Sequence, residues 1–197
     1  MARINKKALM SIQNKKVAPI VNRQTLNKLK SVVNSAHQEM IQNFENHPIT
    51  QEIDGGSEAQ NSSGTLGGYG NLFSFIGFEE GMDPIEPIRN ILRKTLEVRS
   101  VPKSHQSIIM NFLIEIPDKE KIFQSSPMPW ANGRSWAEGI EKGISGLGQY
   151  LNTDTSSSRS GKGIQVKHDV RGGGFRNTKY LSSILNDLKK RIKGGIK

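Results

Sequence analysis

Cysteine is absent from the 197 residues of the chain. Disulfide bonds and thiolate metal sites are therefore excluded, which disfavours a small disulfide-stabilised secreted protein. Long apolar runs are absent as well: no stretch approaches the roughly 20 apolar residues that cross a bilayer. The N-terminus lacks the apolar segment of a signal peptide. We therefore expect a soluble protein made in a cytoplasm, with no membrane partner.

Aromatic residues make up 6% and apolar residues 34% of the chain, whereas glycine reaches 20 residues. Glycine averages about 7% of residues in proteins, so its excess here predicts many turns and few long regular elements. A chain of this length fits one domain with a compact core and leaves residues for surface extensions.

Residues that carry catalysis or bind metals are scarce. The sequence has no Gly-x-Ser-x-Gly nucleophile elbow, no complete P-loop and no credible dinucleotide-binding motif. No histidine is paired with a second ligand at helical spacing, since the four are scattered: His37, His47, His105 and His168. We predict that the protein is not an enzyme and binds no metal or cofactor.

Charge is present in excess, and it is unevenly spread. The net charge is +10, yet residues 51–100 carry eight acids against four bases, while 1–50 and 151–197 are strongly basic. Basic ends attract polyanions such as nucleic acid. Segments of opposite charge also allow one copy to dock on another. The residues predicted to meet a polyanion or an acidic partner are Lys6, Lys7, Lys15, Lys16, Lys189, Lys190 and Arg191.

The first half of the chain divides into an arm, a helix and a loop. Residues 1–22 are basic and lack periodicity, which predicts an extended arm. Apolar residues recur every three or four positions over 23–46 and predict a helix. Residues 49–70 are rich in Gly, Ser, Gln and Asn and read as a long loop, either functional or disordered. We expect 23–197 to form one domain, with a flexible segment at 152–161.

The middle of the chain predicts strands and a short helix. Residues 71–78 read as a strand, and Asp83-Pro84 is a good start for a helix to about residue 96. Negative charge is favoured at such a helix start, although the acids there would also suit a basic partner: Glu79, Glu80, Asp83 and Glu86. Residues 107–116 form the strongest strand pattern of the sequence.

The second half begins with a proline-pinned loop at 125–133. Ser135 and Glu138 match a capping box, which predicts a helix over 135–151. Glycines on one stripe of that helix suggest the close approach of another backbone. A strand is expected at 163–170 and a helix at 177–193. The fold class is α+β, with a small mixed or antiparallel sheet flanked by helices.

Two groups of residues are candidates for contacts between subunits. The first group consists of aromatic residues and the second of the glycines of the 135–151 helix: Phe73, Phe75, Phe78, Trp130, Trp136, Gly139, Gly143 and Gly146.

Two blocks of the sequence resemble a known class of proteins. The first, at 70–85, reads Gly-Asn-Leu-Phe-Ser-Phe-Ile-Gly-Phe-Glu-Glu-Gly-Met-Asp-Pro-Ile. The second, at 133–147, reads Gly-Arg-Ser-Trp-Ala-Glu-Gly-Ile-Glu-Lys-Gly-Ile-Ser-Gly-Leu. They resemble neck and tail-completion proteins of tailed bacteriophages, which join the portal vertex to the tail. The resemblance covers about 30 residues. The long N-terminal lead and the Gly-rich loop at 54–70 depart from a minimal member of that class.

The resemblance implies a non-enzymatic virion protein of the head–tail junction, assembled in the host cytoplasm. It implies a closed ring of identical subunits, hexameric or dodecameric, around the channel through which DNA passes. Its neighbours would be other neck, portal or tail proteins. A tail-terminator role in the same particle is one alternative. A nonspecific nucleic-acid-binding protein that acts through its basic termini is the other, and its binding would depend steeply on salt.

Overall fold

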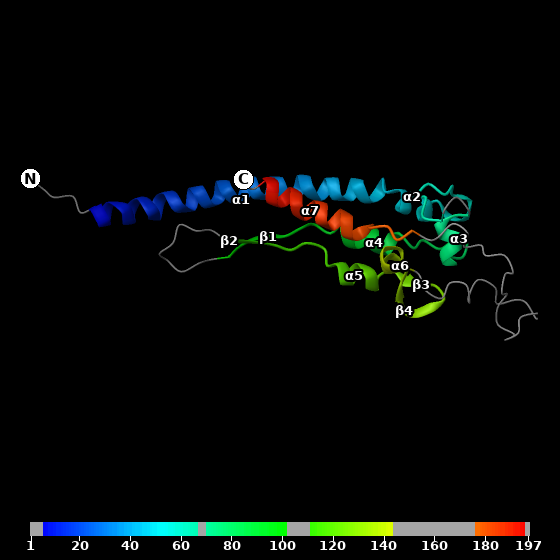
Figure 1. Ribbon diagram of the computed structural model, residues 1–197. Helices are drawn as coiled ribbons and strands as arrows, with labels where there is room; N and C mark the ends of the chain where they lie inside the picture. Colours follow the sequence, from blue (N-terminus) through cyan, green and yellow to red (C-terminus); the bar gives the residue numbers. More distant parts are fainter. Residues whose placement is uncertain (1–5, 67–69, 102–110, 144–175, 196–197) are drawn as a thin grey trace, which may run out of the picture. The chain divides into compact units, whose positions relative to one another are not determined.

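The computed structural model describes residues 6–66, 70–101, 111–143 and 176–195. Helices dominate, and two short antiparallel sheets accompany them, so the chain is an α+β protein (Figure 1). The elements are α1 (Lys6–Glu45), α2 (Pro48–Asp54), the 3-10 turn η1 (Gly56–Glu58), α3 (Leu72–Ile76), α4 (Glu86–Leu92), β1 (Val98–Val101), β2 (Asn111–Ile114), α5 (Lys119–Gln124), β3 (Pro127–Met128), β4 (Ala131–Ser135), α6 (Trp136–Lys142) and α7 (Leu181–Gly195).

The contacts of the chain group into two compact units. Unit 1 joins three segments that are distant in sequence: 1–39, 95–116 and 188–197. Unit 2 contains 40–94 and 117–187. The helices α1 and α7 are each continuous and contribute residues to both units.

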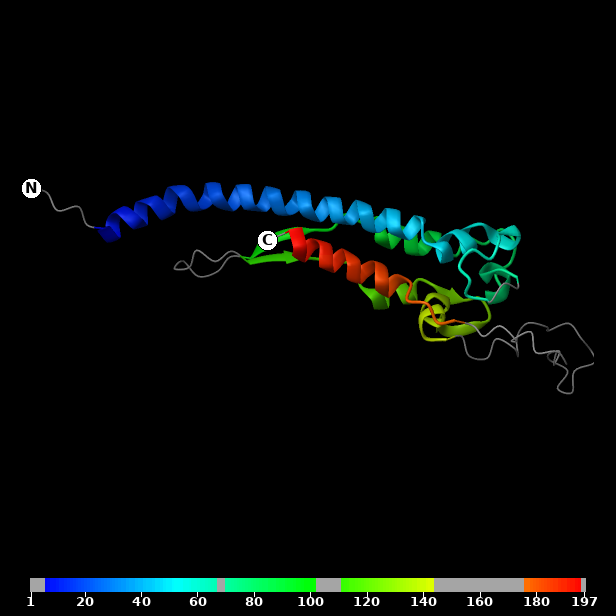
Figure 2. The same cartoon turned by 45° about the horizontal axis from the view of Figure 1, so that its top comes forward.

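Unit 1 is built from α1, the β1–β2 hairpin and the end of α7. The hairpin is antiparallel, with Val98 opposite Ile114 and Arg99 opposite Leu113. Leu113 is half exposed, whereas its neighbours in β2 are partly covered. In both views the last turns of α7 run beside α1 in the opposite direction, and the first turns of α1 extend past the end of α7 (Figures 1 and 2).

Unit 2 holds most of the buried side chains. Its helices are short, and four of them begin at side-chain caps. His47 accepts from the N–H of Ile49 at 3.2 Å, Asn71 from that of Ser74 at 2.9 Å, Asp118 from that of Glu120, and Ser135 from that of Glu138 at 3.1 Å. Such caps satisfy donors that a helix start leaves unpaired. The predicted capping box at Ser135 is therefore confirmed as a helix start.

Residues 6–22 correct the prediction of an extended arm, because they form the first part of α1. Periodicity was the wrong signal there. The segment contains four Lys and two Ala, with one Leu, one Met and one Gln, and these nine of its 17 residues favour helix without a continuous apolar stripe.

Residues 71–78 are also corrected, since 72–76 form the helix α3 and not a strand. Asn71 caps its first turn, and Gly77 ends it with a backbone φ of 87°, in the left-handed region that favours glycine. The aromatic side chains that suggested a strand instead pack from a single helical turn.

Further boundaries differ from the sequence predictions. The 49–70 loop contains α2 and η1, the 125–133 loop contains the β3–β4 hairpin, and β1 was not predicted. The helix expected over 135–151 ends at Lys142, because Gly143 has a φ of 107°. Only 111–114 of the 107–116 strand is seen as β2. Several predicted segments lie outside the described residues: 107–110, 144–151, 152–161 and 163–170.

Arg89 connects three helices of unit 2. Its guanidinium donates to Glu45 (Nε to Oε1, 3.0 Å), to Glu86 (Nη1 to Oε2, 2.9 Å) and to Asp54 (Nη2 to Oδ2, 3.1 Å). Glu45 is the last residue of α1 and Asp54 the last of α2, where a negative charge meets the negative end of the helix dipole. Arg89 offsets that repulsion. The hydrogen bond to Glu45 is the main cause that raises the pKa of Arg89 above its ordinary value.

Replacing Arg89 with Met should destabilise the protein by about 2–3 kcal/mol, because it leaves three neighbouring carboxylates without their shared cation. Chemical denaturation monitored by circular dichroism measures this. Arg93→Met is the matched control, since Arg93 is more exposed and forms an ion pair with a single carboxylate of the described residues, Glu45. Its loss should stay within about 0.5 kcal/mol. Equal losses for the two variants would contradict the linking role of Arg89.

Candidate functional site

Three predicted interface residues form an aromatic cluster inside unit 2. The ring centroids of Phe73 and Phe78 are 5.4 Å apart, and Phe78 meets Trp136 edge-on at 6.0 Å. Phe73 and Trp136 are buried within the chain. The rings of Phe73 and Trp136 therefore pack inside unit 2 and present little area to a partner.

Trp130 and Phe75 lie close to that cluster. The indole Nε1–H of Trp130 donates to the carbonyl of Ile76 at 2.6 Å. A β-carbon on Gly77 would lie 3.3 Å from Cδ1 of the same indole ring. Trp130 thus packs over the end of α3. Phe75 is the residue before Ile76 in sequence, and it is half-buried.

The predicted glycine stripe is interrupted. Gly139 lies in α6 and is half-buried, Gly143 terminates the helix, and Gly146 is outside the described residues. Gly139 and Gly143 line an open hollow of about 190 Å³ together with Met128, Arg134 and Glu138. Lys142 also lines this hollow and is paired with Glu138.

The buried polar side chains of unit 2 have structural partners. Glu52 is 1% exposed, and its carboxylate accepts from the N–H of Leu72 at 2.7 Å and of Ser63 at 2.9 Å. Asn71 donates from Nδ2 to the carbonyls of Ser57 and Ala59. These bonds tie Ser57, Ala59 and Ser63 to the buried side chains of Glu52 and Asn71.

A second cluster of polar side chains lies around Tyr180, which is fully buried. Its hydroxyl hydrogen-bonds to Thr50 at 2.6 Å, and its ring lies 4.8 Å from the His47 imidazole. Burial raises the pKa of Tyr180. His47 begins α2, where its Nδ1 accepts from the N–H of Ile49 at 3.2 Å. Burial lowers the pKa of His47, and only the neutral imidazole can accept that bond.

These groups do not assemble into a catalytic or metal centre. Among the described residues no group of three or more His, Asp and Glu side chains is placed to hold a metal ion. No helix in the same part of the chain is both long enough and apolar enough to cross a membrane. The charged surface of the described residues is the candidate site.

Charge separates between the two units. Unit 1 contains 15 Lys and Arg residues against three acids, whereas unit 2 contains 13 against 15. The net charge of +10 therefore comes from +12 in unit 1 and −2 in unit 2. Two of the three unit 1 acids are already paired, Glu39 with Arg191 and Glu97 with Arg99.

The predicted basic residues fall on two helices. Lys6, Lys7, Lys15 and Lys16 belong to α1, and Lys189, Lys190 and Arg191 belong to α7, where all three are exposed. Lys189 and Lys193 are one turn apart and share one flank of α7. Arg191 is two residues from each, so it faces another side, where it pairs with Glu39 of α1.

Sequence reasoning missed three exposed cations on α1: Arg23, Lys28 and Lys30. The signal that would have found them is the absence of acids. Glu39 is the first Asp or Glu of the chain.

The end of α7 approaches α1 closely. A β-carbon on Gly195 would lie 2.5 Å from Cγ1 of Val32, which is closer than real contacts allow, whereas one on Gly194 would meet nothing within 4 Å. Glycine at 195 is therefore required for this contact. It brings the two basic ends of the sequence into one unit.

Comparison of the chain with protein families, with curated proteins and with solved structures finds no match.

The neutral His47 cap predicts acid sensitivity. Its pKa in the folded state is below the ordinary value of 6.5, so the unfolded chain takes up the proton first. The free energy of unfolding should therefore fall as the pH drops through about 6.5, until the folded state also binds the proton. His47→Asn keeps a cap acceptor without the titration. Denaturation at several pH values between about 7 and 5 compares the two, and equal slopes would contradict this role.

Gly195→Ala should loosen the end of α7 by up to about 1 kcal/mol, because the new methyl group overlaps Val32. Hydrogen exchange of the last-turn amides of α7 measures the effect. Gly194→Ala is the control and should be neutral or slightly stabilising. Adding Val32→Ala to Gly195→Ala should restore protection. Unchanged protection in Gly195→Ala would show that the close contact is not needed.

Proposed function

We propose that this chain is a non-enzymatic structural protein that assembles with copies of itself, in the setting of the bacteriophage head–tail junction. The observation that carries the proposal is the division of charge between the two units, +12 in unit 1 and −2 in unit 2. A protein with a basic and an acidic part can contact its own copies through two different surfaces. Such heterologous contacts produce rings when the rotation between subunits closes.

An acidic turn supplies one surface. Residues 79–83 connect α3 to α4, and Glu79, Glu80 and Met82 are exposed, with Met82 retaining 45% of its accessible area. Asp83 is used locally, because its Oδ1 accepts from the N–H of Glu86 at 2.9 Å. An exposed methionine beside two carboxylates combines an apolar contact with attraction to lysine.

The Lys189–Lys193 flank of α7 supplies the complementary surface. Both residues are exposed, and neither forms an ion pair with any described residue. The aliphatic stems of lysine can cover an apolar side chain while the ammonium groups reach carboxylates. The acidic turn of one copy therefore fits this flank in the next copy.

The particle setting rests on the two sequence blocks at 70–85 and 133–147 that resemble neck and tail-completion proteins. In the fold these blocks build α3, the 79–83 turn, β4 and α6 of unit 2. The residues of these two blocks therefore build helices, a strand and a turn of unit 2, which suits a protein whose role is assembly. Neck, portal and tail proteins are the proposed neighbours in the virion.

Self-association should weaken steeply with salt, because exposed charges more than about 8–10 Å apart are screened at 0.1–0.15 M. Sedimentation velocity at low and high ionic strength measures it. Glu79→Lys with Glu80→Lys should leave the protein monomeric. Adding Lys189→Glu and Lys193→Glu should restore association, since the charges are then exchanged.

The matched control reverses two other exposed acids, Glu58 and Glu115, and should still associate. Mass spectrometry of purified particles tests the setting separately. A wild-type chain that stays monomeric at every ionic strength and is missing from particles would refute the proposed function.

A further inference from the structure

The exposed face of α1 is free of acids over a long distance. The first 38 residues contain eight Lys and Arg and no Asp or Glu. Residues 6–38 are all part of α1, and at 1.5 Å per residue they span about 50 Å of this helix. Soluble helices normally mix charges of both signs on their exposed side, so this stretch is unusual.

The described exposed side chains of this stretch are all hydrogen-bond donors. The buried stripe of α1 contains Leu29, Val33, Ala36 and Met40. The remaining surface is formed by Arg23, Gln24, Asn27, Lys28, Lys30, Ser31, Asn34, Ser35 and Gln38. Arginine, lysine, amide and hydroxyl side chains are the groups that contact nucleic-acid phosphates.

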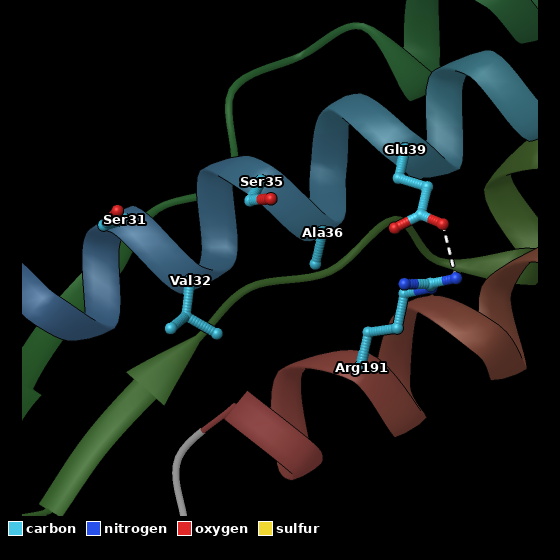
Figure 3. Close-up of a pocket in the computed structure, with 6 residues that line it drawn as sticks. All are labelled: Ser31, Val32, Ser35, Ala36, Glu39 and Arg191. Carbon is cyan, nitrogen blue, oxygen red and sulfur yellow. Dashed lines mark ion pairs between the residues drawn. The ribbon is translucent and has the colours of Figure 1, made fainter.

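The groove beside α1 is also lined by hydrogen-bond donors. Ser31 and Ser35 line an open groove of about 330 Å³, with Val32 and Ala36 between the helices and Arg191 of α7 on the opposite wall (Figure 3). Glu39 closes the groove at one end and is paired with Arg191. The first carboxylate along α1 is therefore neutralised.

From this arrangement we infer that the exposed face of α1, from Arg23 to Gln38, binds the phosphate backbone of double-stranded nucleic acid without sequence preference. The charge of unit 1 draws the polyanion in, and the amide and hydroxyl groups donate to phosphate oxygens. The described part of this face carries no exposed aromatic residue, so it does not stack on the bases of single strands.

The same face does not suit the two other anionic partners. A helix that lies on a membrane inserts large apolar residues into the lipid, whereas the exposed residues listed above for α1 are all polar. An acidic protein would be met better by the Lys189–Lys193 flank of α7, whose two exposed cations are one turn apart. The inference is independent of the self-association proposed above, because it uses different residues.

A labelled mixed-sequence duplex of about 30 base pairs tests the inference by fluorescence anisotropy of the full-length protein across a salt series. The variant Arg23→Gln, Lys28→Gln, Lys30→Gln keeps helix propensity and removes three cations. Each lost phosphate contact should reduce the slope of log affinity against log salt by about 0.9, hence by roughly 2–3 in total, with at least a tenfold weaker affinity at low salt.

The matched control removes the same charge from unit 2 at exposed positions: Lys94→Gln, Lys121→Gln, Lys179→Gln. It should keep the wild-type slope. A second variant, Asn34→Glu with Gln38→Glu, adds acids to the face and should also weaken binding, whereas Asn34→Ala with Gln38→Ala should do so less. Circular dichroism and sedimentation should show the fold and the oligomeric state unchanged in every variant.

Three results would overturn the inference: no binding of the duplex at low salt, equal losses in the α1 variant and its unit 2 control, or displacement of the duplex by polyglutamate at equal charge concentration. The last result would assign the face to acidic proteins. Loss of self-association with normal duplex binding would instead count against the proposed function alone.

Discussion

The arrangement of unit 2 depends on the guanidinium of Arg89. The last residues of α1 and α2 are both acidic, and a carboxylate at the end of a helix is repelled by the helix dipole. These two ends and the start of α4 meet around one arginine, whose planar group donates in three directions. The apolar residues Phe44, Ile53 and Ile88 are buried in the same three elements. The ion pairs therefore determine how these helices meet, and the hydrophobic residues supply most of the stabilisation.

The remaining polar groups of unit 2 follow the same logic. Glu52 and Asn71 replace the backbone partners that an irregular segment lacks, because buried N–H and C=O groups need hydrogen bonds. Tyr180 and Thr50 satisfy each other in the core. The buried ionisable groups Glu52, His47 and Tyr180 thus each have a structural task. Function is left to the surface, where the charge of the chain is concentrated in unit 1.

Sequence patterns located the buried faces correctly. Residues of the apolar stripes in α1, α4 and α7 are buried, including Val33, Ile88 and Leu188, whereas Leu26 at the start of the α1 stripe is only half-buried. The capping signal at Ser135 is also present. The helix predicted from Asp83 to about residue 96 begins instead at Glu86 and ends at Leu92, although Asp83 accepts from the N–H of Glu86. These signals are local, since a cap or an amphipathic stripe requires only neighbouring residues. The strand predicted for 71–78 was wrong because β propensity describes a half-buried position, and the Asn71 cap and Gly77 decide the helix instead.

The sequence by itself determined that the chain lacks cysteine chemistry, carries its positive charge at both ends and folds as α+β. It could not determine that those two ends share a unit, because the contact of Gly195 with Val32 joins residues that are far apart along the chain. Nor could it determine that Phe73 and Trp136 are interior, since an aromatic residue suits a core and an interface equally well. Only the tertiary structure decided these points, because burial and long-range proximity depend on which elements pack together.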